Sequence, residues 1–410
     1  MSITKIVITG GPCAGKSTAM TWIQDHFTKL GYTVLFIPET ATELITGGVA
    51  PWTCNTNLDF QEFLAQLQIT KEDVYERAAK NMGKDKVLIV CDRGLLDNKG
   101  YLQQKEFKEL TKRLDTAEVE LRDMYDAVFH LVTAANGAAE FYTLANNSAR
   151  TETPEEAIAK DNALIAAWTG HPHFRVIDNS TDFNGKMLRL VHEISSFLGE
   201  PEPYEIERKF LIDYPDIAWL ESLPNCEKVE ILQTYLNSAP GDETRVRQRG
   251  KDGHYMYIKT TKKTVSAVKR IEIEQRLSKD EYLRLLMDAD TNMHPLRKTR
   301  YCLTYKNQYF EIDVYPFSTN KAILEIELND ENTPIEFPPE LNILREVTDD
   351  RRFRNTELAK TLQFVEDPQH VELNEQEFID KYCRNCGSQR CEGIGTEWFD
   401  GCHYKNQLKS

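Results

Sequence analysis

A glycine-rich run near the N-terminus has the residue types needed to hold phosphate groups. Residues 10–17 read GGPCAGKS and fit the pattern G-x-x-x-x-G-K-[ST], between a β-rich run at 6–9 and a helical pattern that begins at residue 16. Glycines let backbone N–H groups turn toward phosphate oxygens, and the helix adds its positive N-terminus. The run predicts a P-loop, the alternative being an accidental glycine-rich turn. Its predicted nucleotide-binding residues are Gly10, Gly11, Gly15, Lys16, Ser17 and Thr18.

The same pattern assigns phosphate and metal contacts to individual side chains. Lys16 would reach the β- and γ-phosphates, and the Ser17 hydroxyl would bind Mg²⁺. The apolar run at 87–91 ends in Asp92, which would supply a second Mg²⁺ contact. Many strands end in aspartate, so this interpretation depends on the position of Asp92 after the third strand of a P-loop domain.

Three further polar residues of the first half each have two interpretations. Glu39 follows the second strand. It is either a general base that acts on a phosphate acceptor or a helix N-terminal residue whose negative charge is stabilised by the helix dipole. Arg150 is either a lid arginine that stabilises transferring charge or a solvated surface residue. Asn179, after the fifth strand, either contacts the nucleotide base or forms a turn. Together with Lys16 and Asp92, Glu39 and Arg150 are the catalytic candidates of this half.

Charged residues of the second half alternate with apolar ones along nearly every predicted strand. Period two puts each charged set on one face of its strand. A sheet with one solvated face is the simpler interpretation, but same-face carboxylates repel unless a cation lies between them. A barrel with a charged interior that holds Mg²⁺ or Mn²⁺ and phosphate removes this repulsion. The carboxylate pairs are Glu205/Glu207, Glu272/Glu274, Glu311/Asp313 and Glu325/Glu327.

The order of these strand motifs resembles the CYTH, or triphosphate tunnel metalloenzyme, family. EIERK at 205–209 is similar to its E-x-E-x-K signature, and RVR at 245–247, RIEIE at 270–274, KTR at 298–300 and LEIE at 324–327 follow in order. The resemblance implies an eight-stranded antiparallel tunnel that hydrolyses or cyclises triphosphates with Mg²⁺ or Mn²⁺. The residues it implies are Glu205, Glu207, Glu325 and Glu327 for metal, Lys209, Arg245, Arg247, Lys259, Arg270, Lys298 and Arg300 for phosphate, and Glu205, Glu207 and Lys209 for catalysis.

The first half resembles the AAA_28, nicotinamide-riboside-kinase-like P-loop domains. The order of a P-loop domain followed by a CYTH domain resembles the TRP-channel translocation-defect protein family of eukaryotes. That resemblance implies GTP binding and contact with anionic phospholipid in membrane trafficking. The cysteine-bearing tail departs from the pattern of that family.

The tail has residues that could hold a structural zinc ion. One C-x-x-C pair is a half-site for Zn²⁺, but the second half is irregularly spaced, so reduced thiols in a disordered tail are the alternative. The candidate zinc ligands are Cys383, Cys386, Cys391 and Cys402.

The elements that must position these residues alternate in the first half. Strands are expected at 5–9, 33–37, 86–91, 127–132 and 174–178, and helices at 16–30, 58–80, 107–124 and 184–198. This alternation predicts an α/β domain with a parallel, doubly wound sheet over residues 1–199. The sequence GEPEP at 199–203 predicts a stiff connector.

Strands dominate after the connector. They are expected at 205–212, 229–236, 243–249, 255–260, 267–277, 297–305, 308–315 and 322–328, with amphipathic helices at 217–223, 279–289 and 354–364. This predicts an α+β antiparallel, eight-stranded tunnel barrel over residues 204–366. An acidic linker and the cysteine-bearing tail would occupy residues 367–410.

Composition limits the partners. The 410 residues carry a net charge of −15, which disfavours non-specific nucleic-acid binding, and no run of 18 apolar residues exists. The nine cysteines, five scattered and four in the last 30 residues, are not a secreted disulfide framework, so we expect a cytoplasmic protein, with peripheral membrane contact as an option.

Two functions follow. One is a metal-dependent phosphohydrolase acting on a nucleoside triphosphate or polyphosphate in the tunnel, beside a P-loop domain that binds GTP or ATP or acts as a kinase. The other is a GTP-binding regulator that recognises anionic phospholipid or another phosphorylated ligand without turnover.

Overall fold

The computed structural model describes residues 2–138, 153–200, 206–239, 242–266, 269–328 and 333–364, with the backbone alone at 206, 263–266 and 269–273. The chain divides into two compact units, Met1–Leu362 and Gln363–Ser410, and the first contains the predicted domain at 1–199 and all but the last four residues of the one at 204–366. The domain boundaries at 199, 204 and 366 stay predictions. The candidates that lie outside the described residues are Arg150, Glu205, Cys383, Cys386, Cys391 and Cys402.

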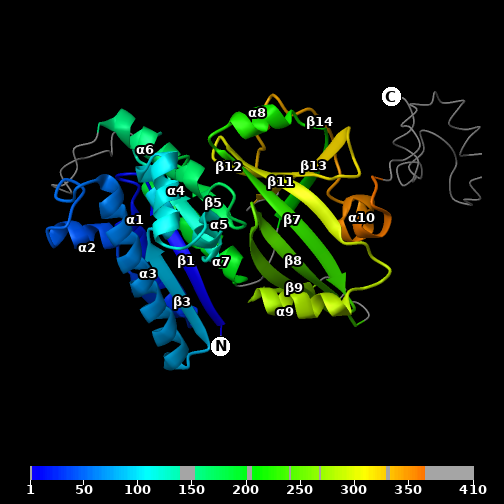
Figure 1. Ribbon diagram of the computed structural model, residues 1–410, viewed down its shortest axis with the longest axis horizontal. Helices are drawn as coiled ribbons and strands as arrows, with labels where there is room; N and C mark the ends of the chain where they lie inside the picture. Colours follow the sequence, from blue (N-terminus) through cyan, green and yellow to red (C-terminus); the bar gives the residue numbers. More distant parts are fainter. Residues whose placement is uncertain are drawn as a thin grey trace, which may run out of the picture. The chain divides into compact units, whose positions relative to one another are not determined.

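The first half of the chain forms the predicted parallel sheet (Figure 1). Its order is β2-β3-β1-β4-β5, so the strand that leads into the glycine-rich run is central, and the strand that ends in Asp92 pairs with it in parallel. The strands are β1 (Ser2–Gly10), β2 (Thr33–Ile37), β3 (Lys86–Asp92), β4 (Ala127–Leu131) and β5 (Phe174–Ile177).

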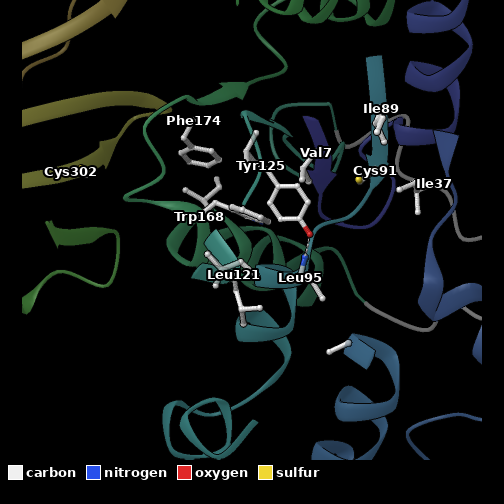
Figure 2. Packing of buried hydrophobic residues seen from close by; sticks show 14 of the residues in the cluster. Val7, Ile37, Ile89, Cys91, Leu95, Leu121, Tyr125, Trp168, Phe174 and Cys302 are labelled. Atoms are coloured by element: carbon white, nitrogen blue, oxygen red, sulfur yellow. Dashed lines mark hydrogen bonds between the residues drawn. The ribbon is translucent and has the colours of Figure 1, made fainter. Parts of the chain in front are cut away.

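Both faces of this sheet are buried because alternate residues of the central strands enter two separate cores. Val7 and Ile89 belong to one core, together with Trp168 (Figure 2). Ile8 and Val90 belong to the other, on the opposite side of the strands. Continuous apolar strands such as these are expected where helices cover both faces, which confirms the doubly wound α/β architecture.

Helices cover the two faces unequally. The core on one side takes residues from α1 and α7, and the core on the other takes residues from α3, η1, α4, α5 and α6. The helical segments are α1 (Lys16–Lys29), α2 (Thr40–Thr46), α3 (Asn57–Met82), η1 (Leu95–Tyr101), α4 (Gln104–Arg113), α5 (Glu118–Asp123), α6 (Pro154–Trp168) and α7 (Phe183–Leu198). Within the described ranges, no helix is both long and apolar enough to cross a bilayer.

The single helix predicted over 107–124 is wrong, because the chain breaks it into α4 and α5. Asp115 adopts a left-handed backbone conformation with φ of 51°. Glu120 then accepts hydrogen bonds from the Thr116 hydroxyl at 2.8 Å and from the Ala117 N–H at 3.1 Å, which starts a new helix.

The second half forms one sheet of nine strands, in the order β10-β9-β8-β7-β11-β12-β13-β6-β14. Neighbouring strands of this sheet pair antiparallel, as predicted. The count of eight missed β14, a four-residue strand, and closure of the sheet into a barrel stays a prediction. The strands are β6 (Ile206–Asp213), β7 (Cys226–Leu236), β8 (Glu243–Lys251), β9 (His254–Ser266), β10 (Lys269–Leu277), β11 (Leu296–Tyr305), β12 (Gln308–Val314), β13 (Lys321–Leu328) and β14 (Ile343–Glu346).

This sheet has an apolar face and a charged face. Phe210, Leu303, Ile312 and Leu324 share one buried core with Leu220 of a covering helix. Residues one position away along the same strands form the opposite, charged face, which carries Lys209, Arg300, Glu311 and Glu325. The helical segments beside the sheet are α8 (Ile217–Ser222), α9 (Lys279–Leu285), η3 (Leu286–Asp288), η4 (Arg351–Phe353) and α10 (Asn355–Thr361).

The first domain covers one end of the charged face. Cys302 and Tyr309, which lie on that face, belong to the same buried core as Trp168 and Phe174 (Figure 2). Arg249 of β8 donates a hydrogen bond to Asp123 at 2.8 Å across the same boundary. The apolar and ionic contacts together join the two domains through a buried interface.

Candidate functional site

The glycine-rich loop has a backbone path that requires its glycines. Gly15 lies just before α1 with φ of +94°, where side chains are strained. A Cβ on Gly15 would lie 2.8 Å from the Phe183 ring, and one on Gly10 would lie 2.2 Å from the Leu131 carbonyl oxygen. The loop therefore passes closely between β4 and α7 and turns directly into the N-terminus of α1.

A buried carboxylate fixes the first turn of this loop. Asp161 Oδ1 accepts the Gly11 N–H at 2.7 Å and the Thr133 N–H at 3.2 Å, and lies 3.0 Å from His130 Nε2. A Cβ on Gly11 would lie 2.6 Å from the same oxygen. Asp161 therefore connects the loop to the end of β4. It also accepts the Gly11 N–H, which the P-loop motif predicts to bind phosphate.

A buried lysine fixes the other side of the loop. Lys186 Nζ donates to the carbonyl oxygens of Ala14 at 3.2 Å and Val132 at 2.6 Å, and to Asn179 Oδ1 at 2.8 Å. The amide of Asn179 donates in turn to the carbonyl oxygens of Thr133 and Asn136, at 2.8 and 2.6 Å. Asn179 is thus engaged in positioning the loop, through carbonyl groups far away along the chain, and both its turn-forming and its base-contacting interpretations stay predictions.

Four charged side chains gather where the loop meets β2 and β3. Arg93 binds the Glu39 carboxylate at 2.5 Å and Asp97 at 3.2 Å. Burial and the nearby Arg93 guanidinium lower the pKa of Lys16. Although burial opposes the change, Arg93 and Lys16 lower the pKa of Glu39 to about 2, so this carboxylate is ionised but weakly basic.

Asp92 is placed where a cation would satisfy it. Its Oδ1 is buried with no hydrogen-bond partner in the described part of the chain, and burial raises the pKa of its carboxyl group. Ser17 and Thr18 are exposed at the start of α1. An orphaned carboxylate oxygen beside the P-loop fits a Mg²⁺ ion held by Asp92 and Ser17.

The charged face of the second domain brings carboxylates together across neighbouring strands. Glu207 of β6 lies directly opposite Glu327 of β13, and Glu311 of β12 lies opposite Glu325 of β13. Like charges at opposed positions of an antiparallel pair repel. Burial, and then the charge of Glu325, raise the pKa of Glu207 to about 7.

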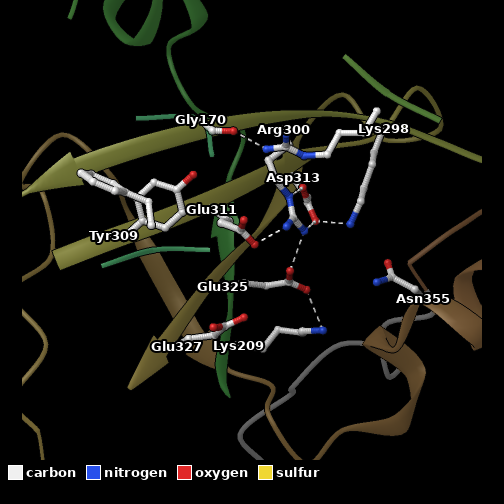
Figure 3. A network of polar contacts seen from close by, with 12 residues as sticks. Gly170, Lys209, Lys298, Arg300, Tyr309, Glu311, Asp313, Glu325, Glu327 and Asn355 are labelled. Atoms are coloured by element: carbon white, nitrogen blue, oxygen red, sulfur yellow. Dashed lines mark hydrogen bonds and ion pairs between the residues drawn. The ribbon is translucent and has the colours of Figure 1, made fainter. Parts of the chain in front are cut away.

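Basic residues partly relieve this repulsion (Figure 3). Lys209 lies 2.7 Å from Glu325 Oε1, and Arg300 lies 2.7 Å from Glu325 Oε2. Arg300 also pairs with Glu311 and Asp313, and Lys298 with Asp313. Lys298 and Asp313 are almost fully buried. The network is therefore a desolvated set of alternating charges, in which Glu207 has the least compensation.

The carboxylates fit a divalent cation through their chemistry. Glu207 and Glu327 are oxygen donors at opposed positions, and a cation between them would remove their repulsion. In the described ranges, no three acidic, histidine or cysteine side chains already converge into a metal cluster. Both carboxylate oxygens of Glu325 form ion pairs, one with Lys209 and one with Arg300, so metal binding by Glu325 stays a prediction.

The remaining predicted phosphate ligands divide between the two faces. Arg245 and Arg247 lie on the charged face of β8, and Arg247 pairs with Glu274 of β10. Arg270 lies on β10 in a stretch where only the backbone is described. Lys259 is opposite Val246 in the ladder, so it lies on the apolar face and is not brought to the others. Lys262, opposite Glu243, lies on the charged face instead.

Sequence reasoning missed several residues that the fold brings to these sites. Arg93 follows Asp92 directly, and a basic residue at that position could have been noted. Asp161 and Lys186 lie inside helices with no motif around them, so only the packing of α6 and α7 against the loop reveals them. Lys262 could have been found by counting alternate positions from Thr260, which faces Glu274.

These features define a class: a P-loop α/β domain joined to an antiparallel sheet with a charged face. A family model described as an AAA domain, AAA_28, matches residues 5–186, and a model described as a CYTH domain matches residues 203–353. An inorganic triphosphatase from Nitrosomonas europaea is 32% identical over 163 residues, which cover 38% of this chain and 98% of the relative.

The chain belongs to the CYTH family, and its CYTH domain follows an AAA domain of the AAA_28 type. Solved structures are also similar. That of an inorganic triphosphatase is 28% identical, covers 38% of this chain and 95% of its own, and has a TM-score of 0.29. A protein from Pyrococcus horikoshii is 18% identical, covers 30% and 78%, and has a TM-score of 0.23.

Proposed function

We propose that the CYTH domain binds and hydrolyses a triphosphate or polyphosphate with the help of Mg²⁺ or Mn²⁺. The observation that carries the proposal is the pair of opposed carboxylates, Glu207 and Glu327, beside a buried row of basic residues. Such a surface offers oxygen ligands to a cation and charged donors to phosphate oxygens. The similarity to an inorganic triphosphatase supports the same substrate class.

The basic residues would act by position and charge. Lys209, Lys298 and Arg300 would exchange part of their carboxylate contacts for phosphate oxygens and orient the chain of phosphates. Arg245 and Arg247 would extend the contact along β8. A cation held by Glu207, Glu327 and Glu205 would neutralise charge on the phosphate oxygens. Water attack at a terminal phosphorus breaks its bond to the bridging oxygen, and the arginines would stabilise the charge that develops there.

For the AAA domain we propose nucleotide binding at the P-loop. Lys16 would contact the β- and γ-phosphates of GTP or ATP, and Ser17 and Asp92 would hold Mg²⁺. Glu39 would serve as a base on an acceptor only after Arg93 releases it, because the Arg93 ion pair keeps the pKa of Glu39 near 2.

The test is phosphate release from tripolyphosphate, ATP and GTP with Mg²⁺ or Mn²⁺. Wild type is compared with Lys16→Ala and with the double variant Glu205→Gln/Glu207→Gln. Loss of turnover in the double variant alone supports hydrolysis in the CYTH domain. Loss in Lys16→Ala alone places the chemistry in the AAA domain and contradicts the proposal for the CYTH domain.

A third outcome would favour the regulator. No turnover by any form, with nucleotide binding intact, contradicts the enzyme proposal for these substrates. Flotation of the protein with liposomes that contain anionic phospholipid, with and without GTP, then tests the membrane-trafficking role that the order of the domains suggests. Absence of GTP-dependent flotation would contradict that role as well.

A further inference from the structure

One short segment of the AAA domain lies along the end of the charged face. Residues 169–175 cover the connection from α6 to β5 and the start of β5, and the first three of them contact β8, β11 and β12 of the CYTH sheet. The Thr169 hydroxyl lies 2.9 Å from the Thr304 hydroxyl, and the Tyr309 hydroxyl donates to the His171 carbonyl oxygen at 2.9 Å. Arg249 donates to the Gly170 carbonyl oxygen. The AAA domain therefore supplies the wall at this end of the charged face.

One basic side chain of this wall, Arg175, contacts the carboxylates of the CYTH sheet. Arg175 pairs with Glu327, one of the two opposed glutamates, through its Nη2. Arg175 and Pro172 line one small pocket together with Glu207, Glu311 and Glu325. An arginine from the first domain is thus part of the site that the CYTH sequence alone was expected to form.

The position of Arg175 is fixed by its own domain. Its backbone belongs to β5, opposite Phe129 of β4. Its Nη1 donates to the Phe174 carbonyl oxygen at 3.1 Å, and its Nε lies 3.8 Å from Glu193 of α7. These contacts come from the AAA domain, so β5 and α7 help to place the guanidinium beside Glu327.

A guanidinium and a divalent cation compete when both bind the same carboxylate. The cation needs the oxygen lone pairs that the arginine uses, and the two positive charges repel. We infer that Arg175 is a positioning residue that the AAA domain supplies to the CYTH site, where it competes with the divalent cation for Glu327. The inference rests on the metal site of the proposed function, and it makes the cation affinity of the CYTH domain depend on the AAA domain.

The experiment measures Mn²⁺ binding alone, by calorimetry on the full chain. A Ser17→Ala/Asp92→Asn background removes the P-loop ligands, so that the CYTH site is titrated. In this background, the added substitutions Arg175→Ala and Arg175→Gln should each make Mn²⁺ binding about three- to tenfold tighter than in the parent. The effect is modest because the ion pair is partly exposed. Arg175→Lys, which keeps the charge, should bind within about twofold of the parent.

The matched control is Arg276→Ala. Arg276 of β10 also crosses to the AAA domain, with Nη2 at 3.0 Å from Asp126 and Nη1 donating to the Met124 carbonyl oxygen at 2.7 Å, but it pairs with none of the clustered carboxylates. Its loss should leave Mn²⁺ affinity unchanged. An equal change in Arg276→Ala would show a general effect of loosening the interface and would overturn the inference.

The remaining outcomes separate this inference from the proposed function. Unchanged or weaker Mn²⁺ binding in Arg175→Ala and Arg175→Gln overturns the competition and leaves the metal site standing. Absence of Mn²⁺ binding in the parent and in every variant overturns the metal site and the inference with it. The Arg175 effect should also shrink between about 0.05 and 0.5 M salt, because ions screen a partly exposed charge.

Discussion

The two phosphate-handling regions of this chain are built in opposite ways. The P-loop is eight consecutive residues, and its shape comes from backbone conformation at Gly10 and Gly15. The charged face of the CYTH sheet collects side chains from strands spread between β6 and β13, and its shape comes from ion pairs among them. The P-loop therefore depends on a short local stretch of sequence, whereas the charged face depends on the register in which distant strands pair.

This difference predicts different penalties for losing a side chain. A lysine that projects from a backbone cradle can be removed without disturbing the cradle. A buried arginine that holds several carboxylates cannot, because the acids it leaves behind stay desolvated and unpaired. Stability measurements should therefore separate the two regions even where function is lost in both.

The largest effect is expected for Arg300→Leu. Arg300 pairs with Glu311, Asp313 and Glu325, and its removal leaves three poorly solvated carboxylates. The free energy of unfolding should fall by about 3–5 kcal/mol. Urea unfolding followed by circular dichroism measures it. The control Arg208→Leu removes a surface pair with Glu346 and should cost under about 1 kcal/mol, so equal losses would contradict the comparison.

Lys16→Ala should change binding and spare stability. Removing the charge that contacts the β- and γ-phosphates should weaken nucleotide binding about 100-fold, or about 2.7 kcal/mol. Titration with a fluorescent nucleotide measures the affinity, and thermal unfolding without nucleotide should be unaltered. Lys29→Ala, in the last turn of the same helix, should match wild type in both. A large loss of stability in Lys16→Ala would show that the cradle depends on its lysine.

His171 should give the boundary between the two regions a dependence on pH. Burial lowers the pKa of this histidine from 6.5 to about 3 in the folded chain. Between these values the unfolded chain binds the proton more tightly, so stability is full above about pH 6.5 and is lost as the pH falls. At pH 5 the loss should be roughly 2 kcal/mol.

The variant His171→Asn isolates this contribution, because asparagine does not titrate. Its free energy of unfolding should decline less than that of wild type between pH 7 and pH 5, as measured by chemical denaturation. Parallel curves for the two proteins would show that His171 is not buried and neutral at the boundary.

The smallest effect is expected in the β11–β12 hairpin of the CYTH sheet. Lys306 and Asn307 form its two-residue turn, with φ of 46° and 64°. Asn307→Gly supplies a residue with no penalty at positive φ, so stability should rise by about 0.5 kcal/mol. Thermal unfolding detects such a shift. Asn307→Val at the same position should be destabilising, and a neutral result would mean that the turn does not use this conformation.

The sequence by itself determined the local features. The P-loop could be predicted because the motif, its strand and its helix are contiguous. The charged face of the second domain could be predicted because period-two charge patterns recur along its strands, and the two families of domain could be predicted because the P-loop and the ordered strand motifs resemble theirs. Confirmed at this level are the parallel α/β domain and the large antiparallel sheet, while the helix at 107–124 was wrong because the turn at Asp115 leaves a weak signal in composition.

Only the tertiary structure decided which residues meet. It placed Glu207 opposite Glu327, put Lys259 on the apolar face, and brought Asp161 and Lys186 to the P-loop and Arg175 to the CYTH carboxylates. The physical reason is that register and packing are set by turns, ladders and helices far away along the chain. A slip of one residue turns a strand's side chains to the other face, and the pattern of a single strand does not show where its partners begin.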